Sequence, residues 1–150
     1  MIDAEAIVLK SADSGETSRR LTFFSEHEGR FSLMARGARK TKRSALGALE
    51  PYTLARVCAN LKPDADLGTL ARAETVEAFP AIRADLTRLA AAAVLCECLD
   101  RATQPRLANP RLYRYAVSFL RTLARESGDK TIFLLGHGLL RAIQALGLAP

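Results

Sequence analysis

The chain has no tryptophan, and aromatic residues make up only 6% of its 150 residues, which leaves few rings to stack on nucleic-acid bases. Its three cysteines, Cys58, Cys96 and Cys98, are an odd number that cannot all pair within one chain. Together with the lack of a charged-then-apolar opening segment, they predict reduced thiols and a cytoplasmic protein. No uncharged apolar stretch approaches the roughly 20 residues of a membrane span, so we expect no contact with a membrane.

Sequence motifs of the common catalytic sites are also missing. There is no Gly-x-x-x-x-Gly-Lys phosphate loop, no His-Glu-x-x-His motif and no credible order of serine, histidine and aspartate. Cys96 and Cys98 lie two residues apart in an expected helix, so their side chains point roughly 200° apart and cannot hold one ion together. We therefore expect no catalytic residue, no cofactor and no metal, and interpret both cysteines as core residues.

One segment nevertheless resembles an enzyme motif. Residues 131–138 can form a buried strand that ends in Gly-His-Gly around His137, which is similar to the second histidine motif of the histidine phosphatases. Such an enzyme needs a first, nucleophilic histidine, and only His27 is available, between Glu26 and Glu28 in a turn. These carboxylates would repel a phosphate from His27, which disfavours the phosphatase. We therefore expect a helix at residues 131–138 and keep a histidine phosphatase as a remote alternative.

Acidic residues are absent between Gly29 and Glu50, and cations crowd into this gap. Five of them fall within eight positions: Arg36, Arg39, Lys40, Lys42 and Arg43. Cations this close together repel one another unless counterions or a polyanion screen them, and the release of condensed counterions drives binding to a phosphate backbone. This basic run therefore predicts a nucleic-acid contact, with a solvated loop as the alternative.

The charge of the whole chain also suits an acidic partner. The formal net charge is +6 and the pI is near 9.7. Residues 1–79 hold 12 cations and 11 acids, whereas residues 80–150 hold 10 cations and 5 acids. We expect both halves to touch the polyanion, with Arg30, Arg19 and Arg20 extending the basic run.

The first half has the pattern of a small β-barrel. Short runs of branched and aromatic residues between turn-forming stretches predict strands at residues 5–9, 21–25, 31–36, 52–61 and 67–75. The second and third should form a hairpin. Five strands suit an OB-fold barrel, which binds oligonucleotides, although the count also allows an SH3-like barrel. Phe24 and Phe31 flank the hairpin and are expected in the barrel core; the alternative is a ring that stacks on bases.

The second half is predicted to be helical, because glycine becomes rare and alanine and leucine dominate. We expect helices at residues 81–103, 109–126 and 130–148. Asn109 is a plausible cap for the second helix, with Pro110 at its first helical position. The chain is therefore interpreted as an α+β protein, with an OB-fold nucleic-acid-binding domain at residues 1–79 and a helical domain at residues 80–150.

The second expected helix has two contrasting faces. Its arginines Arg111, Arg114, Arg121 and Arg125 fall within an arc of about 80°, opposite a side of apolar residues. Because the guanidinium group fits phosphate geometry, Arg114 and Arg121 are candidates for DNA binding, and a solvated face is the alternative.

Several blocks of the chain resemble one bacterial family, the recombination mediator RecO. The blocks lie in order and at family-like spacing, at residues 5–10, 14–16, 19–24, 28–30, 35–40, 47–52 and 73–83. They span most of residues 1–83, and the helical half is compatible in length. The basic loop of the family falls on the same run, from Arg36 to Arg43, that charge density selects by a separate argument.

The resemblance implies a function in DNA repair and homologous recombination. Such a protein binds single- and double-stranded DNA, anneals complementary strands, and works with RecR to load RecA onto strands coated by single-strand-binding protein. It needs no active site and acts in the cytoplasm, on the nucleoid. Many members continue into a four-cysteine zinc module that would begin soon after Pro150, so we expect no zinc here. The alternative is an OB barrel that binds other proteins and uses its cations for solubility.

Overall fold

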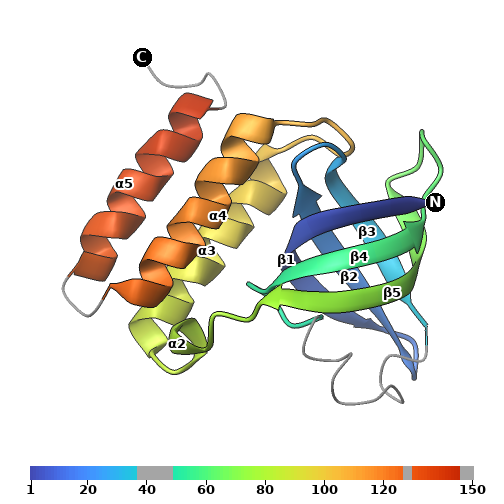
Figure 1. Ribbon diagram of the computed structural model, residues 1–150, viewed down its shortest axis with the longest axis horizontal. Helices are drawn as coiled ribbons and strands as arrows, with labels where there is room; N and C mark the ends of the chain where they lie inside the picture. Colours follow the sequence, from blue (N-terminus) through green and yellow to red (C-terminus); the bar gives the residue numbers. More distant parts are fainter. Residues whose placement is uncertain (37–48, 127–129, 146–150) are drawn as a thin grey trace.

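The computed structural model describes residues 1–36, 49–126 and 130–145. Its strands are β1 (Ile2–Ser14), β2 (Ser18–Ser25), β3 (Gly29–Ala35), β4 (Leu54–Asn60) and β5 (Leu67–Glu77). Its helices are α2 (Pro80–Arg83), α3 (Leu86–Ala102), α4 (Pro110–Arg125) and α5 (Lys130–Ala145). The helices lie together on one side of the strands, with α5 farthest from them (Figure 1).

The strands form a closed barrel in the order β1-β2-β3-β5-β4. Neighbouring strands are antiparallel except β3 and β5, which pair in parallel at Ser32–Leu67, Leu33–Gly68 and Met34–Thr69. A five-stranded barrel of this order is the OB architecture, so the predicted β-then-α fold is confirmed and the SH3-like alternative is not needed. The expected hairpin of the second and third strands is also confirmed.

The first strand is longer than its composition suggests. β1 continues well past the expected residues 5–9, because Ala12, Asp13 and Ser14 all pair with β2. These pairs are made by backbone groups, which any residue type supplies, so a polar sequence does not end the strand. A register shift between Val8 and Lys10 marks an irregularity in this long strand.

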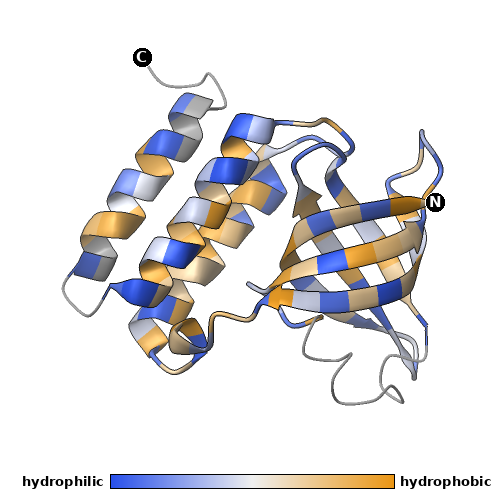
Figure 2. Cartoon of the chain, viewed as in Figure 1, coloured by the Kyte–Doolittle hydropathy of each residue, from blue (hydrophilic) through white to orange (hydrophobic). Residues whose placement is uncertain are grey.

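Two hydrophobic cores divide the side chains between them. One fills the barrel with inward-facing residues such as Val8, Phe23 and Phe31, and the rings of Phe23 and Phe31 stack 5.5 Å apart. The other joins α2, α3 and α4 to outward-facing barrel residues, among them Phe24. Hydrophobic and hydrophilic residues alternate along much of the strands (Figure 2). Both Phe24 and Phe31 are core residues, as expected, and neither ring can stack on a base.

The helix expected over residues 81–103 is wrong in one respect, because the segment forms two helices. The backbone of Asp85 is extended, and its carboxylate accepts a hydrogen bond of 3.0 Å from the Thr87 amide, which caps the start of α3. The predicted cap of α4 is confirmed, because the Asn109 side chain accepts from the Leu112 amide at 3.2 Å. The division into domains at residues 1–79 and 80–150 stays a prediction.

Candidate nucleic-acid interface

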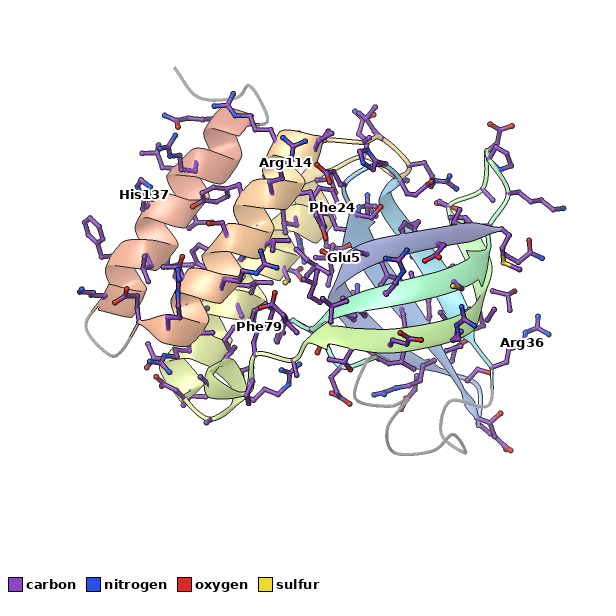
Figure 3. The ribbon with its side chains drawn as sticks, viewed as in Figure 1. Glu5, Phe24, Arg36, Phe79, Arg114 and His137 are labelled. Carbon is purple, nitrogen blue, oxygen red and sulfur yellow. The ribbon has the colours of Figure 1, made fainter. Side chains whose placement is uncertain are left out.

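The basic run begins at the end of β3. Arg36 follows the last residue of that strand and is exposed, on the part of the barrel away from the helices (Figure 3). The other four cations of the run, Arg39, Lys40, Lys42 and Arg43, lie outside the described residues. Arg36 is therefore the member of the run that the structure places.

A groove lies on the outer face of β1, β2 and β3. Leu21 and Phe23 of β2 point into the barrel core, so the alternating Arg20 and Thr22 point outward. The strand register places Lys10 of β1 and Ser32 of β3 on either side of Thr22. The groove has a volume of about 380 Å³ and is lined by Lys10, Ala12, Arg20, Thr22, Arg30, Ser32 and Asp100.

The groove is electropositive and also offers hydroxyl groups. Arg20 is exposed and makes no ion pair with any residue in the described parts of the chain. Lys10 and Arg30 both face Asp100, at 3.9 Å and 3.8 Å from its carboxylate oxygens. Against three cations there is one carboxylate, a surplus that favours an anionic ligand.

The cations continue along β3 towards the basic run. Residues two apart on a strand share a face, so Arg30, Ser32 and Met34 lie on the outer face of β3, and Arg36 follows in the turn after Ala35. The six residues from Arg30 to Arg36, at about 3.3 Å each, span roughly 20 Å, which is long enough to follow several nucleotides. The outer face of β3 thus leads from Arg30, beside α3, to the start of the basic run.

Arg30 is fixed between the barrel and the end of α3. Its Nε donates to the Thr103 hydroxyl at 3.0 Å, and its Nη2 donates to the Thr103 carbonyl at 2.7 Å. Arg19 lies on the opposite side of β2 from Arg20 and makes ion pairs with Asp13 at 3.8 Å and Glu50 at 3.9 Å. Arg30 therefore keeps a place in the groove, whereas Arg19 is engaged elsewhere.

The arginine row of α4 is exposed and its opposite face is buried, as predicted. Two of its members, however, bind the barrel: Arg114 Nε lies 2.6 Å from Glu26 Oε1, and Arg121 Nε lies 2.7 Å from Glu77 Oε1. Arg114 lies on α4, far from Arg36 (Figure 3). The structure therefore does not bring the α4 arginines into the groove with Arg20, and these pairs link α4 to the barrel.

Sequence reasoning missed Lys10 and Asp100 as groove residues. Lys10 is a lone cation just after an expected strand, and Asp100 lies in an expected helix some 90 residues later. The register between β1 and β2 brings Lys10 beside Thr22, and the packing of α3 on β1 brings in Asp100. A residue pattern within one segment carries no signal for either contact.

A second hollow, of about 400 Å³, has the opposite character. Its lining includes the carboxylates of Asp3, Glu5, Glu26 and Glu28 together with His27, Arg56 and Tyr113. The Tyr113 hydroxyl donates to Glu5 Oε1 at 3.2 Å, and burial, with the Glu5 charge second, raises the pKa of Tyr113. Carboxylates dominate this hollow, so its charge disfavours a phosphate, in contrast to the charge of the groove.

The strand suggested by the phosphatase alternative is wrong, because residues 131–138 lie within the helix α5. His137 is exposed on this outermost helix (Figure 3). Gly138 is buried, and a Cβ atom there would lie 2.5 Å from the Phe119 ring. Gly138 therefore serves close packing of α5 on α4.

Within the parts of the chain that the structure describes, no three His, Cys, Asp or Glu side chains gather as ligands for a metal ion. None of the described helices has the length and apolar character needed to cross a membrane.

Comparison with known proteins agrees with this fold. Residues 1–79 match the family described as "Recombination protein O N terminal", and residues 83–150 match "Recombination protein O C terminal". Relatives with the name "DNA repair protein RecO" are similar along nearly the whole chain. That of Bacillus pumilus (strain SAFR-032) is 34% identical over 150 residues, which cover 100% of this chain and 57% of the relative.

Two further relatives extend the comparison. The protein of Pelotomaculum thermopropionicum is 35% identical over 147 residues, covering 98% of this chain and 56% of the relative. That of Geobacter sulfurreducens is 37% identical over 157 residues, covering 98% of this chain and 64% of the relative. The chain thus spans less than two thirds of the length of these relatives. Two consecutive family matches, similarity along the whole chain and an OB barrel followed by helices together show that this chain belongs to the RecO family.

Proposed function

We propose that this chain binds DNA in repair and homologous recombination, through the outer face of β1, β2 and β3 and the basic run that follows it. The observation that carries the proposal is the group of three cations in one groove, Lys10, Arg20 and Arg30, on the face of the strand after which the basic run begins at Arg36. The face of strands 2 and 3 is also where OB folds bind oligonucleotides.

The proposed contact is with the phosphate backbone, in single- and double-stranded DNA alike. Cations and hydroxyl groups bind phosphate without regard to sequence, whereas base readout needs side chains that reach base edges. Phe24 and Phe31 are buried, which leaves stacking no part in the groove. We therefore expect low sequence preference and an affinity that falls steeply with salt.

We further propose the partners and the cellular role that family membership suggests. A face that screens two phosphate backbones lowers the repulsion between complementary strands, which would promote annealing. In this proposal the protein works with RecR to load RecA onto single strands coated by single-strand-binding protein, in the cytoplasm and on the nucleoid. Its support is membership of the RecO family, whose relatives are named as DNA repair proteins.

The test compares two arginines of the barrel. Arg20→Gln removes a charge from the groove, and Arg72→Gln removes the same charge from an exposed position on β5, away from the groove. Fluorescence anisotropy of a labelled oligonucleotide should show about three- to tenfold weaker binding for R20Q at low salt, with the salt slope reduced by about one. R72Q should stay within about twofold of the unsubstituted protein. Equal effects of both variants would contradict a site in the groove.

Reversal of charge tests the basic run. The double substitution Arg39→Glu and Lys40→Glu should abolish most of the low-salt affinity, because it replaces two attractive charges with repulsive ones. Unchanged affinity would show that the run does not bind DNA. A larger loss from reversing Arg114 and Arg121 would move the binding surface to α4.

The alternative from another class is a barrel that binds proteins. The observation in its favour is that several cations, such as Arg114 and Arg121, already pair with carboxylates of the barrel. In that case the unsubstituted protein would bind neither single-stranded nor duplex DNA, even in dilute buffer. The binding curve of the unsubstituted protein therefore separates the two functions.

A further inference from the structure

Asp100 places a carboxylate inside a groove that otherwise suits an anion. It comes from α3, one turn before Thr103, and its side chain is only 18% exposed. Its two oxygens lie 3.9 Å from Lys10 Nζ and 3.8 Å from Arg30 Nη1. Both distances exceed hydrogen-bond length, so the carboxylate neutralises two cations without a hydrogen bond to either.

The two cations do not depend on Asp100 for their positions. Two hydrogen bonds to Thr103 hold the Arg30 guanidinium, and Lys10 has a long side chain that is 58% exposed. The ion pair of Asp100 with the exposed Lys10, at 3.9 Å, contributes little to folding. A structural role therefore accounts poorly for a carboxylate in this position.

The floor of the groove offers donors that Asp100 does not use. Thr22 and Ser32 are each 8% exposed, and their hydroxyl oxygens lie 3.4 Å apart. One hydroxyl proton suffices for the bond between them, and in the described part of the chain no acceptor is assigned to the other. A nearly buried hydroxyl beside three cations is suited to donate to a phosphate oxygen.

We propose that Asp100 is a resident anion that competes with DNA phosphate for Lys10 and Arg30, and so limits the affinity of the groove. The proposal rests on the proposed function and deepens it by naming a residue that regulates the same site. Asp100 is covalently part of α3 and cannot leave as a counterion does. A bound phosphate therefore shares Lys10 and Arg30 with Asp100 and is repelled by the Asp100 carboxylate, which lowers the affinity for the DNA strand.

The experiment compares Asp100→Asn with Glu74→Gln in the full chain. Both variants remove one negative charge, but Glu74 is exposed on β5, across the barrel from the groove. With a labelled single-stranded oligonucleotide at low salt, D100N should bind about three- to tenfold more tightly than the unsubstituted protein. Its salt slope should be steeper by about one, because removal of one negative charge leaves one more cationic charge to exchange its counterion for phosphate. E74Q should change the affinity by less than about twofold.

Two outcomes would overturn the proposal: D100N that binds no more tightly than E74Q, or D100N that is folded and binds more weakly. If D100N fails to fold, NMR of the unsubstituted protein decides instead. Titration with a short oligonucleotide should shift the carboxylate carbon resonance of Asp100 and leave that of Glu74 in place. If the Asp100 carboxylate resonance does not shift at saturating oligonucleotide, competition between Asp100 and phosphate at this site is excluded.

The failure of this inference is distinguishable from that of the proposed function. If the unsubstituted protein does not bind the oligonucleotide, the function itself is wrong. If the unsubstituted protein binds, R20Q weakens binding and D100N has the same affinity as E74Q, then the groove is the binding site and only the proposed role of Asp100 is wrong.

Discussion

At the residue scale, Gly29 allows the barrel and the helices to approach at backbone distance. Its φ is +69°, which side-chain-bearing residues rarely adopt, and a Cβ there would lie 2.5 Å from the Leu107 carbonyl oxygen. Next to it, the Arg106 amide donates to the Arg30 carbonyl at 2.8 Å. The connector between α3 and α4 thus lies directly on the start of β3.

Gly29→Ala should lower the free energy of unfolding by about 2–4 kcal/mol, because it adds a backbone clash to an unfavourable φ. Gly15→Ala is the matched control: its φ is +67°, but nothing lies within 4 Å of the added Cβ. We expect G15A to cost only about 1–2 kcal/mol. Urea unfolding of both variants measures the difference, and equal losses would show that the approach of Leu107 has no energetic cost.

Cys96 gives a second test at the residue scale. It is buried in the core between barrel and helices, and burial raises the pKa of its thiol well above the ordinary value. Since the thiolate is the reactive form, the Cys96 reaction with a thiol reagent at pH 8 should be at least about 100-fold slower than that of Cys58 and Cys98, which are partly exposed. Mass mapping of the modified chain identifies the site, and all three should react alike in denaturant. Fast native modification of Cys96 would contradict its burial.

At the scale of the elements, Asp85 decides where α3 begins. Alanine and leucine periodicity alone favours one continuous helix over residues 81–103, but an aspartate side chain can satisfy free amides at a helix start. In the structure the Asp85 carboxylate does this for Thr87, and the chain turns between α2 and α3. A local side-chain bond therefore outweighs helix propensity at this position.

Asp85→Ala should lower the free energy of unfolding by about 1 kcal/mol through loss of the cap. Asp85→Asn is the control, because asparagine caps a helix equally well without the charge. Thermal unfolding followed by circular dichroism compares the two variants. If D85N loses as much stability as D85A, the effect belongs to the ion pair with Arg88, 3.5 Å away, and not to the cap.

At the scale of the whole molecule, arginines of the helical half bind carboxylates of the barrel. Arg106 pairs with Glu28 at 2.9 Å, and Arg114 and Arg121 pair with Glu26 and Glu77. Part of the positive excess beyond residue 80 is therefore neutralised inside the molecule. The net charge of each half overstates what the helices can offer to DNA, while the barrel face around Arg20 keeps its charge.

Arg106→Met should lower the free energy of unfolding by about 2–4 kcal/mol. Its side chain is 17% exposed and also donates to the carbonyls of Lys62 at 3.0 Å and Ala65 at 2.7 Å, which would lose their donor together with Glu28. Arg101→Met is the control, since Arg101 pairs with Glu97 at the surface within α3, and we expect no measurable change. Chemical unfolding monitors both. An unchanged free energy of unfolding for R106M would show that hydrophobic contacts alone hold the helices against the barrel.

Much of the fold follows from local patterns. The strands, the hairpin and the amphipathic α4 are visible in the sequence because side-chain alternation and helical periodicity act within a few residues. The capping role of Asn109 is equally local. The extent of β1 and the pairing of β3 with β5 are not visible, because backbone pairing with distant segments sets them. For the same reason the sequence names Arg20 and Arg30 as candidates but misses Lys10 and Asp100.

Local residue patterns are enough to predict a barrel followed by helices, a resemblance to RecO proteins and dense positive charge after the third strand. Packing between distant segments determines which cations face a common groove and which form ion pairs. Charge is a property of each residue, whereas its availability depends on neighbours that the fold brings from far along the chain. Arg114 and Arg20 are the same type of residue, but Arg114 pairs with Glu26, whereas Arg20 lines the groove.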